Sequence, residues 1–230
     1  MVLSLTDITD SLNQRSGNPY LKPELIHSFE LTYNQNLKKG SISWVAFYRL
    51  RNDAILPYTV LDENGVAFTQ PQNFGKATTL GAEIIASCNP VSFYGFNASV
   101  SAFNISIEDV ESSSGIANST FTWYMKLINN FKVVRNGSAQ LTWSYTAPTA
   151  IPQGESVAVY FVDAGYQHSI LNGKGRLGLV ITDIFNTQKN GVTIDDADFT
   201  FSRIFKQHKA VMATFAIHSE PPSEKVNEPL

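Results

Sequence analysis

Residues 84–107, with the sequence IIASCNPVSFYGFNASVSAFNISI, contain no charged side chain, and this feature limits most strongly how the chain can fold. The stretch is long enough to cross a membrane as a helix, for which about 20 apolar residues suffice. Asn89-Pro90, Gly95, Asn97 and Asn104 exclude that helix, because lipid would surround their polar groups. A period of two instead predicts two strands joined by a tight turn, each with one apolar and one polar face.

The same alternation recurs along the chain, with turn sequences between the runs and no sustained helical period. We expect nine strands between Leu25 and Ile217, the last of them unbroken from Phe199, and a long polar link over Arg51–Gln72. Most runs alternate for longer than the roughly 5 or 6 residues of a globular strand. Their length suits a tilted membrane strand, which needs about 9 to 11 residues.

The composition favours a surface that excludes charge. Charged residues make up 16% of the chain and aromatic residues 12%, whereas soluble domains are usually about 25% charged. A net charge of −3 offers nucleic acid no basic field, so no nucleic-acid partner is expected. The single cysteine, Cys88, excludes an internal disulfide framework and is interpreted as a small apolar residue near a turn.

The links between the predicted strands alternate in length. The first, third, fifth and seventh are short, and the others are longer and richer in Ser, Asp, Glu and Gly, which is typical of outer-membrane barrels. The predicted fold is therefore all-β, an antiparallel transmembrane β-barrel portion of about nine long strands. An open sheet in lipid leaves two edges unpaired, so we expect it to pair with strands that this sequence does not contain.

Four short motifs carry a family resemblance. GNPYLKPE (Gly17–Glu24) precedes a predicted strand, and its two prolines favour a stiff, structural lead-in. The box resembles the GNPxLxPE box of TonB-dependent receptors, the plugged transporters of the Gram-negative outer membrane. NFGKATTLGAEI (Asn73–Ile84), Gln153-Gly154 and DIFNT (Asp183–Thr187) are similar to sequences of the outer-membrane β-barrel family within that group. The matching positions in the first and last motifs are Gly17, Asn18, Pro19, Leu21, Pro23, Glu24, Asp183 and Asn186.

The resemblance implies the C-terminal part of a receptor barrel in the cell outer membrane. Such a receptor imports a scarce solute, such as an iron chelate, cobalamin or a glycan, with energy supplied through TonB. The implied partners are outer-membrane lipid, the remainder of the barrel, a plug domain, the TonB system and the small-molecule or glycan solute; no cofactor is implied. Along the chain we expect a lead-in over residues 1–16, the barrel portion over 17–218 and a disordered tail over 219–230.

Alternation also predicts which polar side chains line the interior of the barrel. The expected lumen-facing residues, which would be able to contact the plug, are Glu83, Asn97, Ser99, Gln140, Asp163 and Arg176. No GxSxG elbow and no coupled Ser, His and acid are visible, so we expect no enzyme. The four histidines are dispersed and the single cysteine offers them no partner, so no metal site is expected.

Two alternatives to the receptor remain at this stage. One is a passive outer-membrane barrel, completed by oligomerisation or by further sequence. The other is a soluble β-sandwich that binds carbohydrate and buries its apolar faces between two sheets. A monodisperse species purified without detergent would exclude both membrane hypotheses, while a plug domain encoded upstream would favour the receptor.

Overall fold

The computed structural model describes residues 6–7, 11–109, 117–195 and 199–217. These residues form fifteen strands, β1 to β15, and one short 3-10 turn, η1 (Leu171–Gly173). All strand pairs are antiparallel except β2 with β5. No helix in the described residues is long and apolar enough to span a membrane. The predicted all-β, antiparallel class is confirmed.

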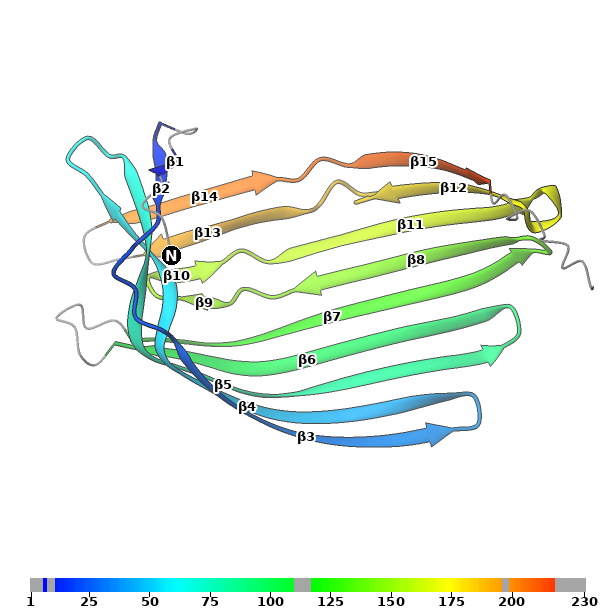
Figure 1. The fold of residues 1–230 in the computed structure, drawn as a ribbon, viewed down its shortest axis with the longest axis horizontal. Coiled ribbons are helices and arrows are strands. Elements are labelled where there is room, and N and C mark those ends of the chain that lie inside the picture. The colour runs from blue at the N-terminus through cyan, green and yellow to red at the C-terminus, as the bar shows by residue number, and fades with distance from the viewer. Residues whose placement is uncertain (1–5, 8–10, 110–116, 196–198, 218–230) are drawn as a thin grey trace, which may run out of the picture.

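Nine long strands form a meander in which each strand pairs with the next (Figure 1). Their bounds are β3 (Leu25–Leu37), β4 (Gly40–Leu61), β5 (Ala67–Val91), β6 (Tyr94–Glu108), β7 (Ala117–Val134), β8 (Gly137–Thr146), β11 (Val159–Ile170), β12 (Gly175–Thr182) and β15 (Ala210–Ile217). The number and order of the long strands agree with the prediction.

The short and long connections lie at opposite ends of the sheet. The turns between β3 and β4, β5 and β6, β7 and β8, and β11 and β12 lie at one end, here called the turn end (Figure 1). The opposite end, the loop end, carries the other connections. The predicted alternation of short and long links therefore corresponds to two distinct ends of one sheet.

Six short strands lie at the loop end. They are β1 (Thr6–Asp7), β2 (Asn13–Ser16), β9 (Ala150–Ile151), β10 (Gly154–Ser156), β13 (Lys189–Asp195) and β14 (Thr200–Lys206). The last four form a separate sheet in the order β14-β13-β10-β9, while β2 runs parallel to the start of β5. In Figure 1, β9 and β13 continue the courses of β8 and β12, and β10 and β14 lead into β11 and β15.

Two expected boundaries were wrong. Arg51–Gln72 was expected to be a polar link, but most of it belongs to β4 and β5, whose pairing extends as far as Leu61 opposite Ala67. A backbone ladder tolerates polar side chains, so polarity alone did not mark the ends of these strands. The last strand is interrupted after Lys206, and its two parts lie in different sheets. Its apolar residues keep odd positions across the break, which hid the interruption.

The register joins the predicted apolar faces into one surface. Tyr33 pairs with Trp44, Trp44 with Ile84, and Ile84 with Val100. The same row then continues through Met125, Tyr145 and Tyr160. Residues paired across strands share a face, and large side chains on this face are exposed, with Leu31 at 75% and Phe121 at 67%.

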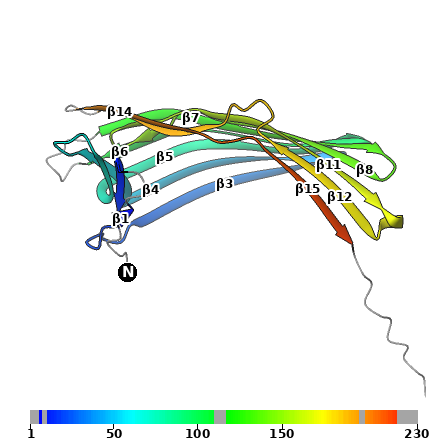
Figure 2. The same ribbon diagram turned by 90° about the horizontal axis from the view of Figure 1, so that it is seen from above.

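The sheet is curved, as Figure 2 shows. Ser101 and Thr122 lie on the polar face and are only 1% and 2% exposed, because the concave side of a curved sheet brings side chains together. The apolar face is convex, and no second layer of the described residues covers it, which a soluble sandwich would require. Within the described residues β3 pairs only with β4 and β15 only with β12, so the sheet is not closed. An incomplete barrel has these features.

Candidate functional site

Three of the family motifs lie at the loop end, and the fourth, Asn73–Ile84, begins there and runs along β5 to the middle of the sheet; at this end the outer part of the β4–β5 hairpin bends across the ends of the other strands (Figure 1). A small core forms beneath the hairpin, on the concave side. It contains Ala54 of β4, Ala77 of β5, Ile107 of β6 and Ala150 of β9, each at most 4% exposed. Strands that are distant in sequence are therefore packed together at this end.

The GNPYLKPE box lies along β5 and is held there by hydrogen bonds between side-chain amides and backbone groups. The side-chain amide of Asn18 donates to the carbonyl of Pro71 at 3.0 Å, and Gln70 donates to the carbonyl of Gly17 at 3.1 Å. The Asn73 side chain accepts from the backbone N–H of Lys22 at 2.8 Å and donates to its carbonyl at 3.0 Å. The first residue of the NFGKATTLGAEI motif thus binds the first motif directly.

Glu24, the last residue of the box, forms a two-point ion pair with Arg51 of β4. Arg51 Nε donates to Oε1 at 2.9 Å and Nη2 donates to Oε2 at 2.6 Å, while the backbone N–H of Ile55 donates to Oε2 at 2.8 Å. The hydrogen bond from Arg51 is the main cause that holds the pKa of Glu24 below its usual value. This pairing fixes the start of β3 to the bend in β4.

Gln153 of the Gln-Gly motif pairs with the β4–β5 hairpin. Its side-chain carbonyl accepts from the backbone N–H of Thr59 at 2.8 Å, and its Nε2 donates to the carbonyl of Thr59 at 2.9 Å. Gln153 is 7% exposed and Thr59 5% exposed. One glutamine side chain therefore satisfies both buried backbone groups of a residue 94 positions away.

The DIFNT motif makes the break between β12 and β13. Asp183 and Asn186 both have positive φ, at 47° and 55°, a conformation that Asp and Asn tolerate better than most residues. The Asp183 carboxylate accepts from the backbone N–H groups of Thr187 at 2.8 Å and Gln188 at 3.0 Å. Burial alone would raise the pKa of Asp183, but these hydrogen bonds outweigh it and the pKa is lowered.

The register places the six predicted lumen-facing residues on the face opposite the apolar surface. Glu83 pairs with Ser101 and Ser99 with Ile85, both on that polar face. The other four follow the same alternation: Asn97, Gln140, Asp163 and Arg176. Their common face is a structural finding, while their position in the lumen of a complete barrel stays a prediction.

Several of these six side chains are engaged within the sheet. Glu83 accepts a hydrogen bond from the Tyr124 hydroxyl at 3.1 Å, and Gln140 donates to Asn130 at 2.9 Å. Asp163 accepts from the backbone N–H of Asp183 at 2.8 Å. Asp163 therefore supports the DIFNT turn, a role that alternation could not indicate.

Phe47 lies on the polar face despite being apolar. It stands opposite Gly81, which in turn stands opposite Phe103, and the two rings lie 6.1 Å apart across the glycine. A Cβ at Gly81 would lie 2.3 Å from Cβ of Phe103 and 2.8 Å from the Phe47 ring. The glycine leaves room for both rings, which pack over its backbone.

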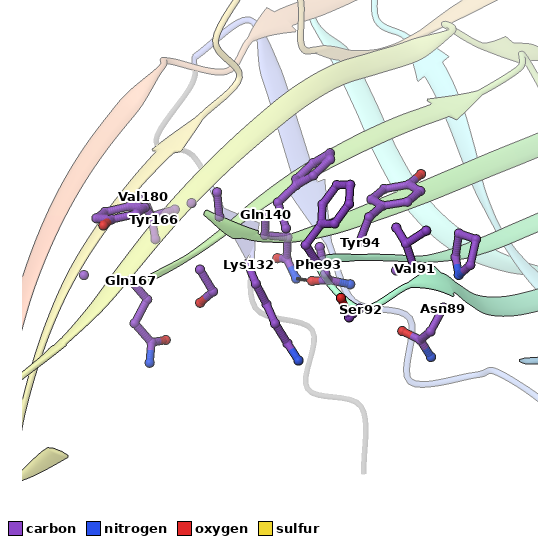
Figure 3. A pocket seen from close by; sticks show the side chains of 18 of the residues that line it. Asn89, Val91, Ser92, Phe93, Tyr94, Lys132, Gln140, Tyr166, Gln167 and Val180 are labelled. Atoms are coloured by element: carbon purple, nitrogen blue, oxygen red, sulfur yellow. Dashed lines mark hydrogen bonds between the residues drawn. The ribbon is translucent and has the colours of Figure 1, made fainter. Parts of the chain in front are cut away.

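A hollow of about 710 Å³ opens at the turn end (Figure 3). Gly165 and Gly178 contribute no side chains to it, and Phe93, Lys132 and Gln140 stand around it. The backbone N–H of Lys132 donates to the carbonyl of Phe93 at 2.8 Å, which holds the β5–β6 turn against β7. Of the predicted lumen-facing residues only Gln140 lines this hollow. Its mixed polar and aromatic lining suits contact with another protein surface or a small solute.

Sequence reasoning missed the partners of the motifs. Arg51 and Thr59 were placed in the polar link, and only the opposite charges of Glu24 and Arg51 would have suggested the first contact. Among the described residues, no three His, Cys, Asp or Glu side chains gather into a possible metal site. The expected disordered tail lies outside the described residues.

Solved structures share this fold at low sequence identity. The copper transporter OprC matches at 15% identity with a TM-score of 0.57, over 86% of this chain and 31% of its own. A ferric enterobactin receptor (PfeA) mutant from Pseudomonas aeruginosa matches at 14% identity with a TM-score of 0.54, over 89% of this chain and 33% of its own. The FrpB iron transporter from Neisseria meningitidis matches at 15% identity with a TM-score of 0.51, over 86% of this chain and 31% of its own. The chain thus spans about a third of the length of these proteins.

Sequence comparison identifies the family directly. A search of curated proteins found no match. Residues 4–217 match the model of the outer membrane protein beta-barrel family, which covers the whole meander and all four motifs. The convex apolar face and the open edges agree with that assignment. The chain therefore belongs to the outer membrane protein beta-barrel family and is part of an outer-membrane barrel.

Proposed function

We propose that the chain is the C-terminal part of the barrel of a TonB-dependent receptor that imports a scarce solute. The observation that carries the proposal is that the four receptor-like motifs meet at the loop end, from which the second motif runs on along β5. There, Gln153 and Glu24 hold the β4–β5 hairpin in a fixed position. A receptor needs such a rigid outer end to present solute-binding loops.

The solved structures support a transport role but no particular solute. The names of the matching proteins refer to copper, iron and ferric enterobactin. At 14–15% identity they bear on the fold, so an iron chelate, another metal complex, cobalamin or a glycan all remain candidates. The polar concave face, with Glu83, Ser99 and Gln140, would line the lumen and meet the plug.

A passive barrel is the competing function, and pore conductance separates the two. The intact protein should be reconstituted in a planar bilayer and its conductance measured before and after addition of urea, which displaces a plug domain. A plugged receptor gives a silent bilayer that conducts only in urea. Stable open channels without urea would show a passive barrel and contradict the proposal.

Uptake identifies the solute. Cells that make the intact protein should be tested with radiolabelled ferric enterobactin, copper and cyanocobalamin, with and without a functional TonB. The proposal expects uptake of one class that is lost without TonB. Uptake that persists at the same rate without TonB would contradict it.

A further inference from the structure

The hollow at the turn end lies on the concave, polar face of the sheet (Figure 3). One row of paired residues crosses it, and its members from β7 to β15 are Lys132, Ser138, Gln167, Gly178 and Thr214. Paired residues share a face, and Ser138 is two positions from Gln140, which lies on the polar face. The hollow therefore opens toward the inside of the curved sheet, where a segment of protein can enter it.

The floor and one wall of the hollow suit a segment of chain. Gly165 lies on the floor, and an added Cβ there would find no atom closer than 3.9 Å. A glycine inside a strand often marks a place where another backbone approaches closely. The ring of Phe93 forms part of the wall and is 59% exposed, so it is available for apolar contacts.

The hollow is positively charged. None of the described residues that line it is acidic, whereas Lys39 and Lys132 are basic. Lys39 donates to the carbonyl of Pro90 at 2.5 Å, while the exposed Lys132 has no acidic partner in the described part of the chain. Arg176 adds a further charge on the same face, opposite Ala216 near the end of β15. Cations therefore stand at both ends of the path from β15 to the hollow.

A segment of opposite charge follows β15. Residues 218–230, HSEPPSEKVNEPL, lie beyond the described residues and beyond the family match, and they contain three glutamates and one lysine. Thr214 lines the hollow three positions before Ile217, which ends β15 at the turn end. The segment therefore starts beside the hollow.

The segment is long enough to reach Lys132. Four strand spacings of about 4.8 Å separate β15 from β7. The row of Lys132 lies three residues, or about 10 Å, along the strands from Ile217, so the direct path is about 22 Å. The seven residues from Ile217 to Glu224 extend to about 24 Å, which brings the Glu224 carboxylate to the Lys132 ammonium.

We propose that residues 218–230 fold back into this hollow. In this arrangement Glu220 lies beside Arg176, Glu224 pairs with Lys132, and the apolar residues that follow meet the exposed aromatic ring of the wall. Charge complementarity and the starting point of the segment favour this occupant over a plug domain or a second copy of the chain. The inference goes beyond the proposed function and holds for any imported solute.

Disulfide trapping tests the proposal in the intact protein, with Cys88→Ala and any other cysteines replaced by alanine. Ser223→Cys is combined with Gln167→Cys in the hollow. The matched control combines it with Asn136→Cys, at the exposed tip of the β7–β8 turn, which is within reach of the same segment but does not line the hollow. A disulfide needs the two Cα atoms within about 7 Å, and mass spectrometry of peptides after mild oxidation measures its rate of formation.

The cross-link to Gln167→Cys should form about tenfold faster than the cross-link to Asn136→Cys, because docking raises the effective concentration of the thiol. K132E/R176E should slow it about fivefold, since each exposed ion pair contributes only a small factor. Adding E220K/E224K should restore the rate. Ser138→Cys is a second reporter in the hollow, and heat-modified gel mobility checks that each variant is folded.

Equal rates at the two positions, or a rate that the charge changes do not alter, would overturn the proposal. Slow cross-linking at Gln167→Cys and Ser138→Cys would show that another occupant, such as a plug domain, fills the hollow. A cross-linked dimer would show that a second copy of the chain fills it. Both of these outcomes would overturn the proposal as well.

Discussion

The side-chain amide of Gln153 occupies both backbone hydrogen-bonding groups of Thr59, as a neighbouring strand would. This contact joins the β9–β10 connection to the β4–β5 hairpin across 94 residues. Because both residues are buried, removal of the glutamine side chain takes away the hydrogen-bond partner of both backbone groups of Thr59.

Replacement of Gln153 by alanine should release the outer part of the hairpin. An unsatisfied buried backbone group costs about 1–3 kcal/mol, so the amide of Thr59 should exchange with deuterium about 30-fold faster. Hydrogen exchange followed by mass spectrometry measures this on the intact protein. Gln140→Ala is the control, since its partner Asn130 lies on the exposed polar face. Equal protection of the Thr59 amide in both variants would show that Gln153 does not hold the hairpin in place.

The Glu24–Arg51 pair predicts a pH-dependent stability. The pKa of Glu24 is lowered in the folded protein from 4.5, so the pair stabilises the fold above that pH. The stabilisation is lost as the pH falls through the lowered folded pKa. Glu24→Gln should be about 1 kcal/mol less stable than the wild type near neutral pH and equal to it in strong acid, as measured by denaturant unfolding. A difference that does not vary with pH would show that the carboxylate charge is not involved.

Neighbouring positions on β5 should respond oppositely to arginine. Ile84 lies on the convex apolar face and Glu83 on the concave polar face. An arginine at Ile84 would face hydrocarbon at a cost of about 2–4 kcal/mol near the midplane, while Glu83→Arg loses mainly its contact with Tyr124. The folded fraction in the outer membrane, read from heat-modified gel mobility, should fall for Ile84→Arg far more than for Glu83→Arg. Equal fractions would reject the assigned faces.

Two glycines on the polar face should differ in their tolerance of alanine. At Gly81 an added Cβ would lie 2.3 Å from Phe103, whereas at Gly165 the nearest atom is 3.9 Å away. Gly81→Ala should therefore destabilise the barrel by about 1–3 kcal/mol, and Gly165→Ala should stay within about 0.5 kcal/mol. Denaturant midpoints in the same detergent provide the comparison. A tolerated Gly81→Ala would show that the rings of Phe47 and Phe103 move apart at no cost.

The sequence predicted the nine-strand meander because side-chain alternation records which face of a strand meets which solvent. Alternation predicts an apolar face for each strand separately, and the register places Trp44, Ile84 and Val100 of three strands in one row. The break in the last strand was not predictable, because its apolar residues keep odd positions on both sides. The extension of β4 past Arg51 was missed because its polar side chains do not alternate with apolar ones. The strand pairing there depends on backbone hydrogen bonds, which the sequence does not record.

The candidate site was predictable only as a set of motifs. The prolines of the GNPYLKPE box indicated its structural role, which the hydrogen bonds of Asn18 and Glu24 support. Their partners Pro71 and Arg51 could not be found without the fold, because contacts between distant segments depend on how the hairpin bends. Asp163 was expected to line the lumen, and its bond to the DIFNT turn depends on a local break that alternation does not record.

The central claim is that hydrocarbon covers the convex face, and the three tryptophans of the chain test it. Trp44, Trp123 and Trp143 all lie on that face. In the intact protein, with any other tryptophans replaced by phenylalanine and the barrel reconstituted in vesicles, lipids brominated on their acyl chains should quench most of the tryptophan fluorescence, and aqueous iodide should quench little. Strong quenching by iodide with none by the brominated lipids would place these side chains in water and contradict the account.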